Sequence, residues 1–304
     1  MFATAPPAAR FLLVEVPGPW GRSAPTDSRL DRYASGRLAD AADRAGVRVL
    51  LIRRPGRHAE PPGEAPRRWA LVDTRRSRQA VRWGSWRHEH ELLDVDLLDS
   101  DVDVDMDVDR GIRRGPAPGR RPQGTGSGPQ QVALVCTQGR HDVCCAVRGR
   151  PVALRLGGAV QNWDVWECSH VGGDRFAANI LLLPSGELFG GLDPDSAVRT
   201  VDTFDAGRLA LSFHRGRVGR SPLEQAALHH VAVAAGEDRR DVLRVETVAG
   251  TEPVWTVEVV GGGRRWVISL VQRWAEPARL TCSSARPERA RRLDVAGLHE
   301  LGRA

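Results

Sequence analysis

The sequence contains no lysine: its 44 basic residues are all arginine, and it has only one tyrosine. Complete avoidance of lysine indicates the bias of a GC-rich genome, so the net charge of +6 and the pI near 9.8 are weak signs of a nucleic-acid partner. The arginines are scattered, and no helix-turn-helix or RNP-like motif is present. We therefore expect no nucleic-acid binding.

Long apolar runs are also missing. No stretch approaches the roughly 20 residues that a membrane span requires, and the short apolar run in MFATAPPAARFLLVEV leads directly into PGPWG, unlike a secretory signal. We expect a cytoplasmic protein with no membrane partner. In a reducing compartment its five cysteines suit metal binding or thiol chemistry better than a disulfide framework.

The chain of 304 residues is long enough for more than one compact unit. In residues 1–93, strand patterns at FLLVEV, RVLLIRR and WALVDT surround the helical pattern of SRLDRYASGRLADAADRAGV, which predicts an N-terminal α/β lobe. Residues 94–128 hold an Asp-rich run and then a Pro/Gly/Arg-rich run. The Asp run lacks the Gly and Glu of an EF-hand loop, so we interpret this segment as a low-complexity linker.

Residues 129–218 show the clearest order of elements. VALVC and DVWEC predict strands, a helix is expected over about 146–161, and ANILLLPSGELFGGL predicts a hairpin. Asp193 as N-cap and Pro194 at the first position then start another helix. This β-α-β-β-β-α order matches a thioredoxin-like layer, while residues 219–304 predict a helix and three strands. The expected class is α/β, with a thioredoxin-like central unit and a small C-terminal α+β extension.

Two short segments, VCTQGRHDVCC and ECSHVGGDRF, concentrate the chain's thiols. A thioredoxin-type dithiol needs C-x-x-C, but Cys144 and Cys145 are adjacent. A zinc knuckle prefers two to four residues between its cysteines, whereas Cys136 and Cys145 are further apart. A cysteine hydrolase built on Cys144 or Cys145 with His141 or His170 has no recognisable oxyanion feature. A [2Fe–2S] cluster, with two ligands per iron, fits the two segments best, and the spacing leaves the other three options open.

The same segments carry a family resemblance. VCTQGRHDVCCAVRGRP and VWECSHVGGDRFAANILLLPSGELFGGLDP resemble the sucrase/ferredoxin-like family, a branch of the thioredoxin-like [2Fe–2S] ferredoxins. EVPGPWG near the N-terminus and RLTCSSARPERARRLDVAGLHEL near the C-terminus are similar to that family as well. The resemblance implies a redox cluster near the protein surface and single-electron transfer to an unknown redox partner protein.

The resemblance also implies the ligands. The family's first two cysteines fall on Cys136 and Cys145, and its second ligand pair falls on His170 and Asp174. Because Asp174 departs from the family's histidine or cysteine, we expect Cys168 to complete a set of Cys136, Cys145, Cys168 and His170. Asp174 and Cys144 are reserve ligands. The residues expected to tune the cluster are Arg140, His141, Gly172, Gly173 and Arg175.

The remaining features have simpler interpretations. Cys282 in RLTC is expected to be a buried structural cysteine, His229 and His230 ordinary helix residues, and Trp20 a residue that closes a turn over the core. No carboxylate pair indicates a glycosidase, and GGGRR lacks the strand–loop–helix context of a nucleotide site. The sequence therefore predicts an electron carrier more than an enzyme. A cluster-free scaffold and a cysteine-dependent thiol redox enzyme remain as alternatives.

Overall fold

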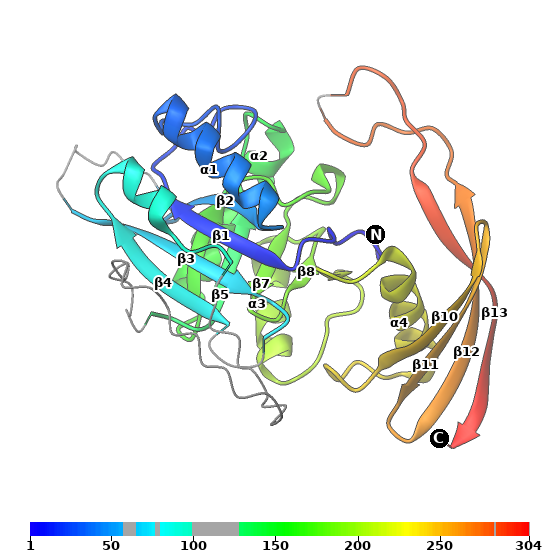
Figure 1. The fold of residues 1–304 in the computed structure, drawn as a ribbon. Coiled ribbons are helices and arrows are strands. Elements are labelled where there is room, and N and C mark those ends of the chain that lie inside the picture. The colour runs from blue at the N-terminus through cyan, green and yellow to red at the C-terminus, as the bar shows by residue number, and fades with distance from the viewer. Residues whose placement is uncertain (57–64, 77–79, 99–127, 283, 304) are drawn as a thin grey trace, which may run out of the picture.

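The computed structural model describes residues 1–56, 65–76, 80–98, 128–282 and 284–303. Most of the Asp-rich run and the following Pro/Gly/Arg-rich run lie outside the described residues. The chain is a mixed α/β protein with one large sheet and a separate smaller sheet (Figure 1). None of the helices that the structure describes is long and apolar enough to cross a lipid bilayer.

The large sheet has nine strands in the order β4-β3-β1-β2-β6-β5-β7-β8-β9. The strands before and after the Asp-rich segment, β1–β4 and β5–β9, therefore share one sheet. The two sets join where β2 pairs antiparallel with β6, through Ile52↔Cys168 and Arg53↔Glu167. The pairs β1–β2 and β5–β6 are parallel. The strands are β1 Arg10–Glu15, β2 Arg48–Arg53, β3 Arg67–Asp73, β4 Val81–Trp86, β5 Val132–Cys136, β6 Asp164–Cys168, β7 Ile180–Leu183, β8 Glu187–Phe189 and β9 His214–Arg217.

The helices against this sheet begin at the caps that their sequences provide. Asp193 accepts backbone hydrogen bonds at the start of α3, and Pro194 occupies its first turn, as the sequence predicts. The aliphatic face of α1 buries Leu38 and Ala42. The elements are α1 Arg32–Arg44, α2 Val143–Ala159, α3 Pro194–Asp205 and the short 3₁₀ helices η1 Glu89–Asp94 and η2 Asp174–Phe176.

The start of α2 differs from the prediction. The helix begins at Val143, with Asp142 as its N-cap, whereas the sequence analysis started it near residue 146. Cys144 and Cys145 consequently lie in the first turn of the helix and not before its start. Cys145 points into the core with no exposed surface, while Cys144 is half-buried.

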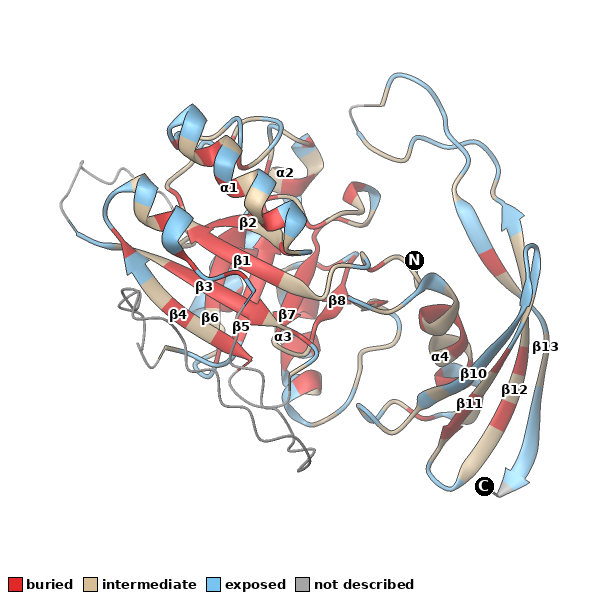
Figure 2. Ribbon diagram, viewed as in Figure 1, coloured by how far each residue is buried: buried red, intermediate tan, exposed pale blue. Residues whose placement is uncertain are grey.

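The smaller sheet, in the order β10-β11-β12-β13, packs against α4 (Pro222–Ala235), which lies between it and the large sheet (Figure 1). Buried positions lie on α4, β11 and β12 (Figure 2). Their apolar side chains belong to one core cluster. The antiparallel pair joined at Gly261–Gly263 is confirmed. The strands are β10 Arg244–Thr251, β11 Val254–Gly261, β12 Arg264–Trp274 and β13 Arg291–Arg303.

Candidate metal centre

Cys136 and Cys145 lie at the two ends of one loop. Cys136 ends the buried strand β5, and the chain then turns through residues 137–142 into α2. Asp142 accepts a backbone hydrogen bond from Cys145 at 3.1 Å and so sets the first turn of the helix. Gly149, one turn later, lets α2 approach β5, since a Cβ there would lie 2.1 Å from the carbonyl oxygen of Cys136.

His170 completes a cluster of three side chains. It follows β6, and its Nδ1 lies 3.8 Å from Cys136 Sγ and 4.0 Å from Cys145 Sγ. The ligand atoms of these three residues all lie within 4.8 Å of one another. Two thiols and one imidazole from separate elements are thus close enough to bind the same metal or cluster.

A second group shares His170. Its Nε2 lies 2.9 Å from Asp174 Oδ1, and its ring stacks on that of His141 with centroids 4.0 Å apart. The ligand atoms of His141, His170 and Asp174 also lie within 4.8 Å of one another. The carboxylate contact occupies Nε2, so Nδ1 is the nitrogen of His170 that faces the thiols.

Cys168 is placed differently from Cys136 and Cys145. It pairs with Cys136 across the parallel strands β5 and β6 and is fully buried. Among the described residues it belongs to none of the groups whose ligand atoms lie within 4.8 Å. Burial raises the pKa of its thiol well above the usual value.

The thiols and the imidazole of the cluster influence one another's protonation. The hydrogen bond with Cys145, against the effect of burial and with help from His170, lowers the pKa of Cys136 well below its usual value. The same hydrogen bond, together with burial, raises the pKa of Cys145. Burial opposes protonation of His170, but hydrogen bonds with Asp174 and Cys136 outweigh it and raise the pKa to about 9. Without a metal, these effects favour proton loss at Cys136 and retention of the proton at His170.

Two arginines that the sequence analysis missed hold the loop of His170. Arg48 on β2 donates to the carbonyl oxygens of His170 at 2.7 Å and Val171 at 3.4 Å. Arg215 on β9, only 1% exposed, donates to the carbonyl oxygen of Gly172 at 2.8 Å. Both guanidinium groups interact electrostatically with Cys136. No local pattern marks them, because each reaches the loop from a distant strand.

Gln138 is a further residue that the sequence analysis missed. Its side-chain oxygen accepts a 2.7 Å hydrogen bond from the backbone of His170, and its nitrogen donates to the carbonyl oxygen of Gly21 at 3.0 Å. Gln138 thus connects the PGPWG segment to the loop of His170. Trp20 is buried there, as expected, under the guanidinium of Arg53 at 4.4 Å.

The expected tuning residues differ in position. Arg140 and Arg175 are exposed, and Arg175 stacks on Phe176 at 4.4 Å. Gly172 and Gly173 have φ of 99° and 76°, and a Cβ at Gly173 would lie 2.3 Å from the Arg215 guanidinium. These glycines therefore shape the loop of His170 and leave room for Arg215.

Cys282 corrects the sequence analysis. It is exposed in a turn between β12 and β13 and is not a buried strand residue. Its ligand atom lies within 4.8 Å of those of Asp142 and Cys144. The error arose because RLTC has the alternation of a strand, but no neighbouring strand covers it.

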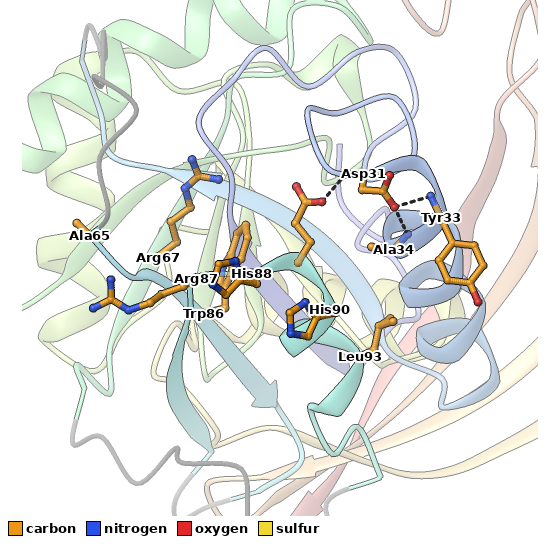
Figure 3. A pocket seen from close by; sticks show the side chains of 11 residues that line it. Asp31, Tyr33, Ala34, Ala65, Arg67, Trp86, Arg87, His88, His90 and Leu93 are labelled. Carbon is orange, nitrogen blue, oxygen red and sulfur yellow. Dashed lines mark hydrogen bonds between the residues drawn. The ribbon is translucent and has the colours of Figure 1, made fainter.

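A large cavity lies away from the cysteines. It has a volume of about 750 Å³ and lies between α1 and η1, where Asp31, His88 and His90 line it (Figure 3). The carboxylates of Asp31 and Glu89 already accept backbone hydrogen bonds: Asp31 caps α1, and Glu89 accepts one from the Asp31 N–H at 2.8 Å. The thiol–imidazole cluster remains the better candidate for chemistry.

The sequence model of the sucrase/ferredoxin-like family matches residues 1–216. The chain belongs to this family. No curated protein and no solved structure matches it. The matched region of this sucrase/ferredoxin-like chain contains the large sheet except the last residue of β9, and it contains the cluster of Cys136, Cys145 and His170. Cys282, α4 and the smaller sheet follow it.

Proposed function

We propose that this chain binds a [2Fe–2S] cluster and acts as a single-electron carrier. The observation that carries the proposal is the convergence of Cys136 Sγ, Cys145 Sγ and His170 Nδ1 within 4.8 Å. Thiolates with imidazole on one of the irons form a known donor set for such clusters. The residues present therefore fit the group that the family implies.

The arrangement supports one assignment of the ligands. Cys136 and Cys145 would bind through sulfur and His170 through Nδ1. Asp174 would hold Nε2, in the way that carboxylates orient metal-binding histidines. His141, which stacks on His170 and shares a ligand group with it, is then the candidate for the fourth ligand. Cys168, which the sequence analysis preferred, stays a buried thiol in this assignment.

When bound, the cluster would accept and release one electron at a time. The chain's contribution is the environment. Arg48 and Arg215 supply positive charge near the thiolates, which favours the more negative reduced state. The proposed ligands Cys136 and Cys145 are shielded from water, while His141 and His170 line a cavity of about 340 Å³. Electrons would enter and leave at this imidazole side, where an unidentified redox partner protein would dock in the cytoplasm.

The order and pairing of β6-β5-β7-β8, with α2 connecting the parallel pair β5–β6, support the thioredoxin-like arrangement that the resemblance implies. In this arrangement the loop after β5 and the loop after β6 emerge at the same edge of the sheet, because parallel strands end together. The proposed ligands lie on these two loops and on the start of α2.

One observation favours a second candidate function. Cys136, His170 and Asp174 follow one another in the order nucleophile, base and carboxylate that thiol enzymes use. Against it, Cys136 is 1% exposed, so a substrate has no approach to its sulfur. Rapid alkylation of Cys136 in metal-free protein would favour this candidate over the electron carrier.

The test is a visible absorption spectrum with iron and acid-labile sulfide analysis on protein purified without oxygen. We expect a red-brown protein with about two irons and two sulfides per chain. Colourless protein after reconstitution, or zinc in place of iron, would contradict the proposal. His141→Ala should lose or shift the charge-transfer bands, whereas Cys168→Ser should keep them. The opposite pattern would restore Cys168 as a ligand.

A further inference from the structure

Cys144 and Cys282 meet although they come from different parts of the chain. Cys144 is in the first turn of α2, and Cys282 lies in residues 275–290, which connect β12 to β13 beyond the region that the family model matches. The described residues of this connection, 275–282 and 284–290, form a narrow ribbon held by the reciprocal backbone hydrogen bonds of Ala278 and Glu288, at 3.0 and 2.9 Å. The ribbon brings its turn from the smaller sheet to the start of α2.

Asp142 fixes both cysteines at this contact. One carboxylate oxygen accepts the backbone N–H of Cys144 at 3.2 Å, and the other accepts that of Cys282 at 2.6 Å. The two sulfurs and the carboxylate lie within 4.8 Å of one another. The helix cap therefore also anchors the ribbon, and it holds the two sulfurs within 4.8 Å of each other.

Exposure separates this pair from the other cysteines. Cys282 is exposed and Cys144 is half-buried, whereas the thiols buried in the core are Cys136, Cys145 and Cys168. Exposure and thiolate character together decide which thiol a small oxidant attacks. Burial and hydrogen bonds with Cys282 and Asp142 raise the pKa of Cys144, so the exposed Cys282 is the thiol that would react first, while Cys136 is only 1% exposed. Oxidation would therefore begin at the ribbon and spare the centre of Cys136, Cys145 and His170.

We propose that Cys144 and Cys282 form a disulfide that tethers the ribbon to α2. With a peroxide as oxidant, one thiol attacks an oxygen and becomes a sulfenic acid while water leaves. The second thiol then displaces a second water from that sulfur. Two S–H bonds are replaced by one S–S bond, and the peroxide accepts the two electrons.

The tether joins the C-terminal sheet to the residue next to Cys145. Oxidation would thus fix the ribbon beside the proposed cluster ligand Cys145. Reduction would break this covalent link and leave the hydrogen bond from the Cys282 N–H to Asp142. The proposal does not depend on the cluster, because neither cysteine belongs to the group of Cys136, Cys145 and His170.

The experiment treats the full-length protein with hydrogen peroxide, blocks free thiols with iodoacetamide under denaturing conditions, and maps peptides before and after reduction. We expect two of the five thiols to escape alkylation, with one linked peptide pair containing Cys144 and Cys282. Cys144→Ser and Cys282→Ser should each abolish the pair, and the matched control Cys168→Ser should keep it.

A second readout uses the arginines of the ribbon. Limited digestion with trypsin should cut the ribbon after the exposed Arg279, whereas Arg286 precedes Pro287 and is not a trypsin site. The fragment beginning at residue 280 contains Cys282, so the disulfide with Cys144 would hold it to the rest of the chain. A cut at Arg279 should release a fragment from denatured oxidised protein only after reduction. Alkylation of all five thiols, or a disulfide between Cys136 and Cys145, would overturn the proposal. So would a bound zinc ion that prevents oxidation and that Cys282→Ser removes.

Discussion

The two nitrogens of His170 lie in different environments. Nδ1 faces the thiols of Cys136 and Cys145, and Nε2 faces the carboxylate of Asp174. The sequence analysis treated Asp174 only as a weak replacement ligand, because a motif shows which residue stands at a position and not which atom it contacts. In the structure the same residue is placed to orient its neighbour.

Replacing Asp174 with Asn tests this role in the metal-free protein. We expect the pKa of His170 to fall from about 9, because burial, which lowers it, remains and the carboxylate is lost, so that Cys136 alone still raises it. An NMR titration of the imidazole proton measures the shift. Asp195→Asn, at an exposed carboxylate on α3, is the control and should leave the titration unchanged. An unaltered His170 pKa in Asp174→Asn would rule out the role.

Gly172 and Gly173 allow the cost of backbone strain from a positive φ to be compared with the cost of a steric clash with a neighbouring side chain. Both have positive φ, but a Cβ at Gly173 would meet Arg215 at 2.3 Å, whereas no atom lies within 4 Å of one at Gly172. We expect Gly172→Ala to cost about 1 kcal/mol of unfolding free energy and Gly173→Ala about 2–4 kcal/mol. Urea denaturation measures both. Equal losses would show that Arg215 moves aside freely.

At the scale of elements, α2 positions Cys145 through its close approach to β5. Gly149 is in its interior against the carbonyl oxygen of Cys136, while Gly158 near its end is exposed and unobstructed. We expect Gly149→Ala to destabilise the protein by about 2–3 kcal/mol and Gly158→Ala to stabilise it by about 0.5–1 kcal/mol. Thermal unfolding followed by circular dichroism distinguishes them. Similar effects would mean that α2 is not closely packed on β5.

Elements with strong local signals were predicted well. Alternating or continuous apolar runs identified β1, β2, β3, β5 and β6, and capping residues identified α3. The sequence analysis missed β4, β9 and β13. β9 is only four residues, HRGR, and gains its place from pairing with β8. β13 is largely exposed and polar, so its pairing with β12 leaves little apolar pattern to detect.

For the whole molecule, the N-terminal segment connects the large sheet with α4. Thr4 accepts hydrogen bonds from Arg215, the backbone of Ala5 bonds with the side chain of Gln225 on α4, and Phe2 stacks on His229 at 4.5 Å. Burial, with His230, His214 and the N-terminal amine, lowers the pKa of His229 to about 4.

This shift predicts a pH dependence of stability. Because the unfolded chain takes up a proton at His229 near pH 6.5 and the folded chain only near pH 4, the contribution is complete above pH 6.5 and is lost as the pH falls toward 4. After discounting for partial exposure, we expect a loss of about 1–2 kcal/mol. His229→Gln should weaken this dependence in urea denaturation, and the exposed control His299→Gln should not. Identical pH profiles for His229→Gln and the unaltered protein would contradict the assignment.

The sequence by itself determined the mixed α/β class, the start of α3 at its local cap, and the two segments that hold the candidate ligands. These are properties of neighbouring residues, which fix periodicity and capping. The family resemblance had already implied that His170 belongs with Cys136 and Cys145. Only the tertiary structure decided that Cys168 stays apart, that Arg48 and Arg215 hold the loop, and that Cys282 reaches Asp142. These contacts depend on strand order and side-chain direction across the sheet, and no spacing along the chain encodes them.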